Sequence, residues 1–375
     1  MEKRITLQAG PHERVNCPVC RELTAPVEAV RLVETDSGRG IPAQLDGTRA
    51  HWIVDKLGAG ETREYTLSDE PGEAGAGMTV DQQDGRMDVL LDDALLASYH
   101  HAADRVRPFI NPLIGPTGVS VLRELFEEPD KDKGHDHIHH RGILVAHGDV
   151  NGTDNWSESK QHGRQRHVKT ESTAGGPVFA RIAVENDWVS NADEHLLREQ
   201  RAMIFWNVTD GTRIVDVQVR FLADTRDVTF GDTKEGGILS VRVPTVLRAD
   251  RAGRMANVYG GIGEKECWGK RAHWCDYHGE LEGEQVGVAV FDHTSNFRHP
   301  TYWHIRNYGL FAANPFGLSH YYRDKSRDGS HTIRKGETFE FRYRVYVHKG
   351  DTTAGRVAEA YHDYINPPQF REDAT

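Results

Sequence analysis

The sequence predicts an all-β fold: a two-sheet antiparallel super-sandwich, preceded by a small β-sandwich module and ending in a short C-terminal helix. Two observations predict this. Segments in which apolar and polar residues alternate recur along the chain, with clusters of Gly, Asn and Asp between them, as antiparallel strands joined by hairpins require. The length of 375 residues also suits two large packed sheets beside a smaller first module.

The first 75 residues are predicted to form the small module. Short strands are expected at residues 29–34, 51–54 and 63–67. The boundary falls within residues 69–79, where Asp, Glu, Pro, Gly and Ala make a flexible, turn-forming stretch. The predicted domains are therefore residues 1–75, a β-sandwich module, and residues 76–375, the super-sandwich that catalyses or binds.

The second domain carries the clearest strand patterns, at residues 201–208, 213–222, 285–291 and 339–348. In the last of these, alternate residues from Phe339 to Val347 are apolar, which is typical of a half-buried antiparallel strand. A helix is expected only near the end, over residues 353–365, where apolar residues recur at helical spacing before two prolines.

Charge and hydropathy narrow the classes of partner. The formal net charge is -11, whereas nucleic acids and anionic membranes attract basic surfaces, so neither partner is expected. The mean hydropathy of -0.63 and the lack of a long apolar run predict no membrane span. The first ten residues lack the apolar core of a secretory signal, so a cytoplasmic location is expected.

The most informative stretch is residues 134–142, which read GHDHIHHRG. Four histidines lie within six positions, beside a carboxylate and a guanidinium: His135, His137, His139 and His140, with Asp136 and Arg141. Neutral imidazole is both a base near neutral pH and the commonest metal ligand in proteins. If the run is extended, His135, His137 and His139 share one face. A solvated histidine-rich loop is the alternative to a functional cluster.

Other segments combine titratable and aromatic residues. Lys234 and Glu235 lie in a turn bounded by glycines, GDTKEGG at residues 231–237, and such turns often present reactive groups from a rigid sheet. Trp268 and Trp156 lie among hydrogen-bonding residues, a combination that suits the apolar faces and hydroxyl edges of a sugar. An ordinary surface ion pair and core tryptophans are the competing interpretations.

Residues 300–317 add a strand-like pattern. If this run is extended, Tyr302, His304 and Arg306 share one face, and Trp303 and Ile305 share the other. An aromatic ring, an imidazole and a guanidinium aligned along one face of a strand indicate the surface of a binding cleft.

Five motifs together give the chain a family resemblance. They are RPFINPL at 107–113, DHIHHRG at 136–142, GDTKEG at 231–236, HPTYWHIRNYG at 299–309 and NPFG at 314–317. With these, most of residues 80–350 resembles the PmoA-like family of uncharacterised soluble bacterial proteins. The resemblance implies a β-rich fold similar to the super-sandwich of galactose mutarotase and several polysaccharide lyases, and a role in sugar metabolism. It implies no particular reaction.

The leading hypothesis is a carbohydrate-active enzyme of the epimerase, lyase or hydrolase type that uses acid–base chemistry. One of His137, His139 and His140 would move one proton, and Glu235 or His304 would move the other. Negative charge would be stabilised by Lys234, Arg141 or Arg306. The stacking surfaces for the sugar would be Trp156, Trp268 and Tyr302.

Two alternative hypotheses about function use some of the same residues. In the first, two or three of the histidines, with His137 and His139 as candidates, hold a divalent metal together with Asp136 or Glu235. In the second, the protein binds a sugar through its aromatic residues without catalysis. No nucleotide-binding motif is present, so no cofactor other than a metal is indicated, and the expected partner is a small-molecule carbohydrate.

Overall fold

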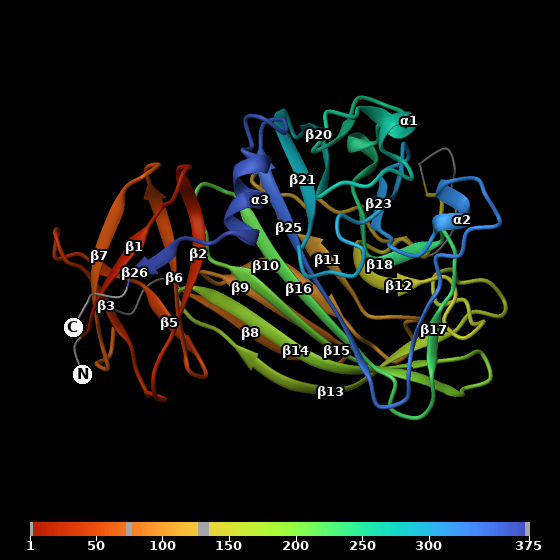
Figure 1. The fold of residues 1–375 in the computed structure, drawn as a ribbon, viewed down its shortest axis with the longest axis horizontal. Coiled ribbons are helices and arrows are strands. Elements are labelled where there is room, and N and C mark those ends of the chain that lie inside the picture. The colour runs from red at the N-terminus through yellow and green to blue at the C-terminus, as the bar shows by residue number, and fades with distance from the viewer. Residues whose placement is uncertain (1–2, 73–76, 127–134, 372–375) are drawn as a thin grey trace.

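The computed structural model describes residues 3–72, 77–126 and 135–371 (Figure 1). Strands account for 50% of the protein and helices for 6%, and the sheets are antiparallel. The predicted all-β fold, with two large sheets and a short C-terminal helix, is confirmed. Within the described residues, no helix is both long and apolar enough to cross a membrane.

The small N-terminal module consists of two sheets. Their orders are β26-β1-β7-β3-β4 and β2-β6-β5. The strands are β1 (Lys3–Gln8), β2 (Arg14–Glu22), β3 (Arg31–Glu34), β4 (Gly40–Ile41), β5 (Ala43–Asp46), β6 (Arg49–Leu57), β7 (Thr62–Ser68) and β26 (Gln369–Arg371). Their alternating apolar residues meet in a core around Trp52, whose ring packs against Tyr65 and Phe370.

The last strand of this module comes from the other end of the chain. β26 pairs with β1 through Thr6, Leu7 and Gln8, so the two ends of the described chain lie side by side (Figure 1). The predicted boundary after residue 75 therefore omits one strand of the module. Residues 73–76, in the middle of the predicted linker, lie outside the described residues.

Two eight-stranded sheets form the large sandwich. The first large sheet has the order β22-β23-β18-β12-β11-β10-β9-β8. Its strands are β8 (Met78–Gln83), β9 (Arg86–Leu91), β10 (Ala94–His100), β11 (Phe109–Leu113), β12 (Ile143–His147), β18 (Gly236–Arg242), β22 (Trp303–Arg306) and β23 (Leu310–Ala313).

The second large sheet has the order β13-β14-β15-β16-β25-β21-β20-β19. Its strands are β13 (Arg164–Ala174), β14 (Phe179–Val189), β15 (His195–Trp206), β16 (Arg213–Leu222), β19 (Arg254–Asn257), β20 (Trp274–Leu281), β21 (Glu284–Asp292) and β25 (Thr338–Lys349). The predicted strand at 339–348 is β25, and its residues Phe341, Tyr343, Val345 and Val347 are buried in the core between the sheets.

The remaining elements are short. A two-stranded pair joins β17 (Val228–Phe230) and β24 (His331–Ile333), and the helices are η1 (Thr245–Leu247), α1 (Gly263–Cys267), α2 (Leu318–Tyr321) and α3 (Val357–Ile365). Helix α3 begins four residues later than predicted. Arg356 has a left-handed backbone with φ of 53°, and Asp351 accepts hydrogen bonds from the amides of Thr353 and Ala354, so a turn replaces the first helical turn.

Strand register decides which residues the first large sheet turns outward. His304 pairs with Ala312, Ala312 with Ser240, and Ser240 with Leu144, and directly opposed residues share one face of a sheet. Arg306 and Arg242, two residues along from His304 and Ser240, lie on that same face. Trp303 and Ile305 belong to the core between the sheets, so the predicted alternation along this strand is confirmed.

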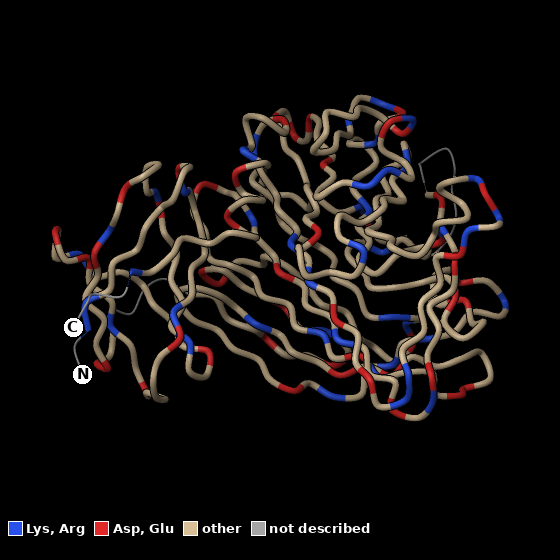
Figure 2. Tube along the Cα trace, in the orientation of Figure 1, with Lys and Arg blue, Asp and Glu red and all other residues tan. Residues whose placement is uncertain are grey.

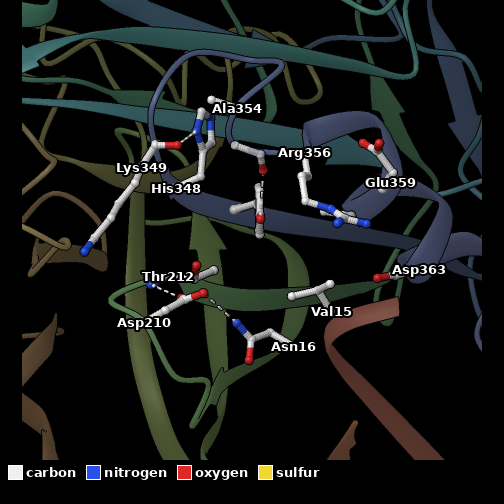
Figure 3. A pocket seen from close by; sticks show the side chains of 13 residues that line it. Val15, Asn16, Asp210, Thr212, His348, Lys349, Ala354, Arg356, Glu359 and Asp363 are labelled. Atoms are coloured by element: carbon white, nitrogen blue, oxygen red, sulfur yellow. Dashed lines mark hydrogen bonds between the residues drawn. The ribbon is translucent and has the colours of Figure 1, made fainter. Parts of the chain in front are cut away.

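A polar cavity separates the small module from the large sandwich (Figure 3). Its volume is about 190 Å³, and its walls include Val15 and Asn16 of β2, Asp210, and residues of β25 and α3. Asn16 donates a hydrogen bond to Asp210 across it at 3.1 Å. Beside it, the Arg14 guanidinium donates to Asp363 of α3 at 2.9 Å. Hydrogen bonds and an ion pair thus hold the module on the sandwich.

Two buried ion pairs lie in the second large sheet, Arg344–Asp216 and Arg201–Glu199, and the second is the more enclosed. Arg201 donates two hydrogen bonds to Glu199, at 2.5 and 3.0 Å, and both side chains are buried. The Trp188 indole donates a third hydrogen bond to Glu199 at 2.6 Å. Because a buried carboxylate needs such partners to offset its lost hydration, this pair is a sensitive point of the fold.

We expect Arg201→Met to lower the free energy of unfolding by about 3–5 kcal/mol, because it leaves the Glu199 carboxylate buried without its cation. The matched control is Arg220→Met on the next strand, where Arg220 and Glu340 are both about half exposed and an exposed pair contributes about 0–1 kcal/mol. Chemical denaturation of both variants measures the difference. Equal losses would show that burial of the pair has no consequence.

Candidate active site

The histidine run folds as a tight turn, not as an extended strand. His137 has a left-handed backbone with φ of 48°, and the His140 amide donates to the His137 carbonyl at 2.9 Å. The Arg123 guanidinium closes the turn from the core side by donating to the carbonyls of His137 and His140. His135 stacks on Phe126, 4.1 Å away, whereas the rings of His137 and His139 are 5.8 Å apart, so only two of the three histidines of the predicted face lie together.

Three rings stack over this turn. The His137 ring lies parallel to that of His140 at 4.9 Å and nearly parallel to that of Tyr308 at 4.8 Å, between centroids. The Arg242 guanidinium lies over the Tyr308 ring at 4.8 Å. Tyr308 was not among the predicted site residues. Its place in the motif HPTYWHIRNYG, two positions after Arg306, is the signal that could have identified it.

The Asp136 carboxylate is bound by arginine side chains. Its carboxylate accepts hydrogen bonds from Arg242 at 2.5 Å and Arg123 at 2.8 Å, and Arg248 lies 3.7 Å away. Burial opposes its ionisation, but the adjacent His137 and these arginines outweigh burial and hold the pKa of Asp136 well below its usual range. Asp136 therefore fixes the arginines in place and has little capacity left to bind a metal.

His140 is neutral, with its proton on Nε2. The Arg242 Nη1 lies 2.8 Å from His140 Nδ1, and because a guanidinium only donates, Nδ1 must be the acceptor. Burial, and then the charges of His139 and Arg242, lower the pKa of His140 well below the ordinary value. His140 is thus a fixed hydrogen-bond donor through Nε2 and not a base.

His304 has the same tautomer for a different reason. The Trp268 indole, which only donates, lies 3.1 Å from His304 Nδ1, so the His304 proton is on Nε2. The side chain is 2% exposed. Burial, then the positive charges of Lys234 and Arg306, lower its pKa to about 3. A neutral imidazole held in this way donates a hydrogen bond to developing negative charge, but does not remove a proton.

His139 is the third neutral histidine. Its ring meets the edge of Trp156 at 5.5 Å, and burial followed by the charge of Arg107 lowers its pKa to about 3. Arg107 and Arg141 both lie at Glu158, 3.5 and 2.9 Å from its carboxylate oxygens. The predicted ligand-binding residue Arg141 is therefore buried in an ion pair beside the histidines.

Lys234 and Glu235 come from the turn before β18, and their side chains contact each other. The turn is anchored because Asn314 donates to the carbonyls of Thr233 and Gly236, each at 3.0 Å. Glu235 is 46% exposed on its side chain. Glu235 is therefore an accessible carboxylate on a turn that is anchored by hydrogen bonds.

The predicted aromatic surfaces are largely covered. Trp156 is 3% exposed and contacts His139 and His140, and Tyr302 is 8% exposed and stacks on Tyr321. Their rings therefore pack inside the protein in this structure and do not present a face to a sugar. Trp268 is half-buried, and its indole N–H donates a hydrogen bond to His304 Nδ1.

Contacts bring two of the predicted segments together. Trp156 lies against His139 and His140, and a Cβ on Gly236, at the start of β18, would meet the Trp156 ring at 2.8 Å. The charges of Lys234, Arg306 and His137 also lower the pKa of His304. Together with the register of β22 and β18, this places the histidine turn, the Lys234–Glu235 turn and β22 over the outer face of the first large sheet. Among the described residues, no three His, Cys, Asp or Glu side chains are arranged to hold a metal ion.

Comparison with known proteins gives a family but no activity. Residues 86–362 match a family described as a family of unknown function (DUF6807). The matched region contains every strand of the large sandwich except β8 and every residue of the site above. No curated protein matches the chain.

We expect the His304 ring to stay neutral, with its proton on Nε2, between about pH 5 and 8, because its pKa is lowered to about 3 from an ordinary value of about 6.5. Long-range ¹H–¹⁵N correlation spectra of the imidazoles measure both properties. Trp268→Phe removes the indole donor, so signals of the Nδ1–H tautomer should appear.

The matched control for this test is Trp274→Phe, a tryptophan of the second large sheet that packs against Phe291 and Tyr361. It should leave the His304 signals unchanged. Protonation of His304 in the parent protein with a midpoint above about pH 6, or no tautomer change in Trp268→Phe, would contradict the assignment.

Proposed function

The chain belongs to this family of unknown function, DUF6807, and from the geometry of its site we propose that it is a carbohydrate-active enzyme that acts by acid–base catalysis. The reaction we propose begins with removal of a proton from a carbon next to a carbonyl or carboxyl group of a sugar. The observation that carries this proposal is the fixed, neutral Nε2–H tautomer of His304 beside an accessible carboxylate, Glu235.

The donors of the site favour this chemistry over glycoside hydrolysis. Hydrolysis builds positive charge on the sugar and ordinarily uses two carboxyl groups. In the described part of the site, Asp136, Glu158 and Glu264 are paired with arginines, which leaves Glu235, paired with Lys234, as the most exposed carboxylate. Removing a proton next to a carbonyl instead builds negative charge on oxygen, which neutral imidazole donors and cations stabilise.

Roles follow from exposure and hydrogen bonding. Glu235 takes the proton from carbon, the bonding electrons move to the carbonyl oxygen, and His304 donates its Nε2–H to that oxygen. Lys234 and Arg306 stabilise the same charge. His137, the exposed member of the ring stack, returns a proton to the opposite face in an epimerase or protonates the leaving oxygen in a lyase.

The two alternatives have less support. A metal site would need Asp136 or Glu235 beside two histidines, but Asp136 already binds Arg123 and Arg242. A purely sugar-binding protein would need exposed aromatic faces, whereas two of the three predicted aromatic residues, Trp156 and Tyr302, are buried and Trp268 is half-buried. Neither alternative explains why His140 and His304 are held in one tautomer.

Glu235→Gln should lower turnover by about 10²–10⁴-fold, because the amide cannot accept a proton from carbon, and should leave the thermal midpoint nearly unchanged because the side chain is exposed. Turnover is measured without knowing the product, as incorporation of deuterium from D₂O into a panel of neutral and acidic sugars, followed by ¹H NMR.

The matched control for this measurement is Glu340→Gln, an equally exposed glutamate on the second large sheet, which should exchange deuterium at the parent rate. Exchange by Glu235→Gln at the parent rate would show that Glu235 is not the base.

A further inference from the structure

Arg306 holds a guanidinium fork toward the outer face of the first large sheet, beside His304. On the assumption that the proposed function is correct, we infer that the sugar substrate carries a carboxylate, and that Arg306 and Lys234 bind it. Neutral sugars are then poor ligands, and the substrate class is sugar acids such as uronates. The inference rests on the geometry of Arg306, the surplus of donors around it and the buried arginines behind it.

Arg306 is paired but its terminal nitrogens are available. Its Nε lies 3.1 Å from a carboxylate oxygen of Glu264 in an ion pair without hydrogen-bond geometry, and its guanidinium lies over the Tyr308 ring at 5.5 Å. Glu264 is itself held because its other oxygen accepts the Asn307 amide at 2.7 Å. Neither Nη atom of Arg306 donates a hydrogen bond to another described residue, and the side chain is half-buried. A planar guanidinium held by an ion pair and an aromatic ring can bind a carboxylate through its two Nη atoms.

Donors outnumber acceptors around this fork. His304, which is 2% exposed, carries its proton on Nε2, and Lys234, in contact with Glu235, adds a cation on a side chain that is partly exposed. The negative groups that face the same region are Glu235, in contact with Lys234, and Glu264, paired with Arg306. The strongest charges acting on His304 are all positive, and they lower its pKa. The local potential therefore favours an anion, although the whole chain has a net charge of -11.

Buried arginines behind the histidine turn add to that potential. The Nε atoms of Arg107, Arg123 and Arg242 are buried without a hydrogen-bond partner. Burial lowers the pKa of Arg107 to about 10 and, together with the charge of Arg242, that of Arg123 to about 9. Figure 2 shows Lys and Arg segments gathered around β18 and β23 of the first large sheet. An anion bound there would compensate charges that the protein leaves only partly paired.

The chemistry of the proposed reaction points to a carboxylate in particular. When a proton leaves the carbon next to a carboxylate, negative charge grows on the carboxylate oxygens themselves. A guanidinium fork and an imidazole donor at those oxygens bind the transition state more tightly than the ground state, which is the condition for catalysis. The same groups would contribute little to a sugar whose only polar groups are hydroxyls.

Isothermal titration and thermal shift test this inference with glucuronate, galacturonate and gluconate, each beside its neutral parent sugar, at constant ionic strength. At least one sugar acid should bind at least about tenfold more tightly than its parent, because charge-assisted hydrogen bonds to Arg306 are lost in the neutral sugar. Arg306→Gln should remove that preference, and Arg306→Lys should restore part of it. The control, Arg220→Gln on the second large sheet, should keep it.

The outcomes separate this inference from the proposed function. If neutral sugars bind as tightly as their acids, the inference is overturned while the proposed function stands. If no sugar of either kind binds, both are rejected. Inorganic phosphate is the third ligand measured: if it binds Arg306 as tightly as the best sugar acid does, the site recognises oxyanion charge alone and the inference is again overturned. The comparison of ligands on the parent protein does not depend on any variant folding.

Discussion

The pairing of β18 with β23 is the constraint on which the site depends. Gly237, with φ of 150°, lies so close to β23 that a Cβ there would meet the Ala313 carbonyl oxygen at 2.5 Å. Only glycine allows this approach, and the β12–β18 register shifts at the same point. A slip of one residue would turn every side chain of β18 to the other face. Arg242 would then enter the core, and the histidine turn would lose the guanidinium that holds it.

The buried arginines lower the stability of the fold but support the proposed chemistry of the site. Guanidinium groups taken out of water destabilise the folded chain unless they are paired, and here Asp136 and Glu158 pair them only in part. Burial lowers the pKa of His139 and His140 most, and the charges of Arg107 and Arg242 lower it further, so that both imidazoles stay neutral. Donors that are already oriented and uncharged need no reorganisation when negative charge develops, so the folding free energy spent on these arginines supports the proposed chemistry.

The fold class could be predicted from the alternation of apolar and polar residues, because each strand shows this pattern in its own sequence. The outward face of Tyr302, His304 and Arg306 was predictable for the same reason. The turn at His137 was not, since its left-handed backbone depends on Arg123 and Arg242, which are distant in sequence. The pairing of β26 with β1 could not be predicted either, because a strand of three residues is too short to show an alternating pattern. Burial of Trp156 and Tyr302 depends on the packing of loops, which alternation does not describe.

Trp268 determines which of Glu235 and His304 can act as the base in the proposed reaction. Had His304 Nδ1 faced water or a carboxylate, the ring could have carried its lone pair toward the substrate and served as the base. The indole N–H keeps the imidazole lone pair on Nδ1, facing Trp268. His304 can therefore only donate a hydrogen bond to the substrate, and a carboxylate has to remove the proton. Trp268 directly follows α1, whose Glu264 also fixes Arg306. One short helix therefore sets both the tautomer of His304 and the position of the cation beside it, and the two donors of the proposed oxyanion site are positioned together.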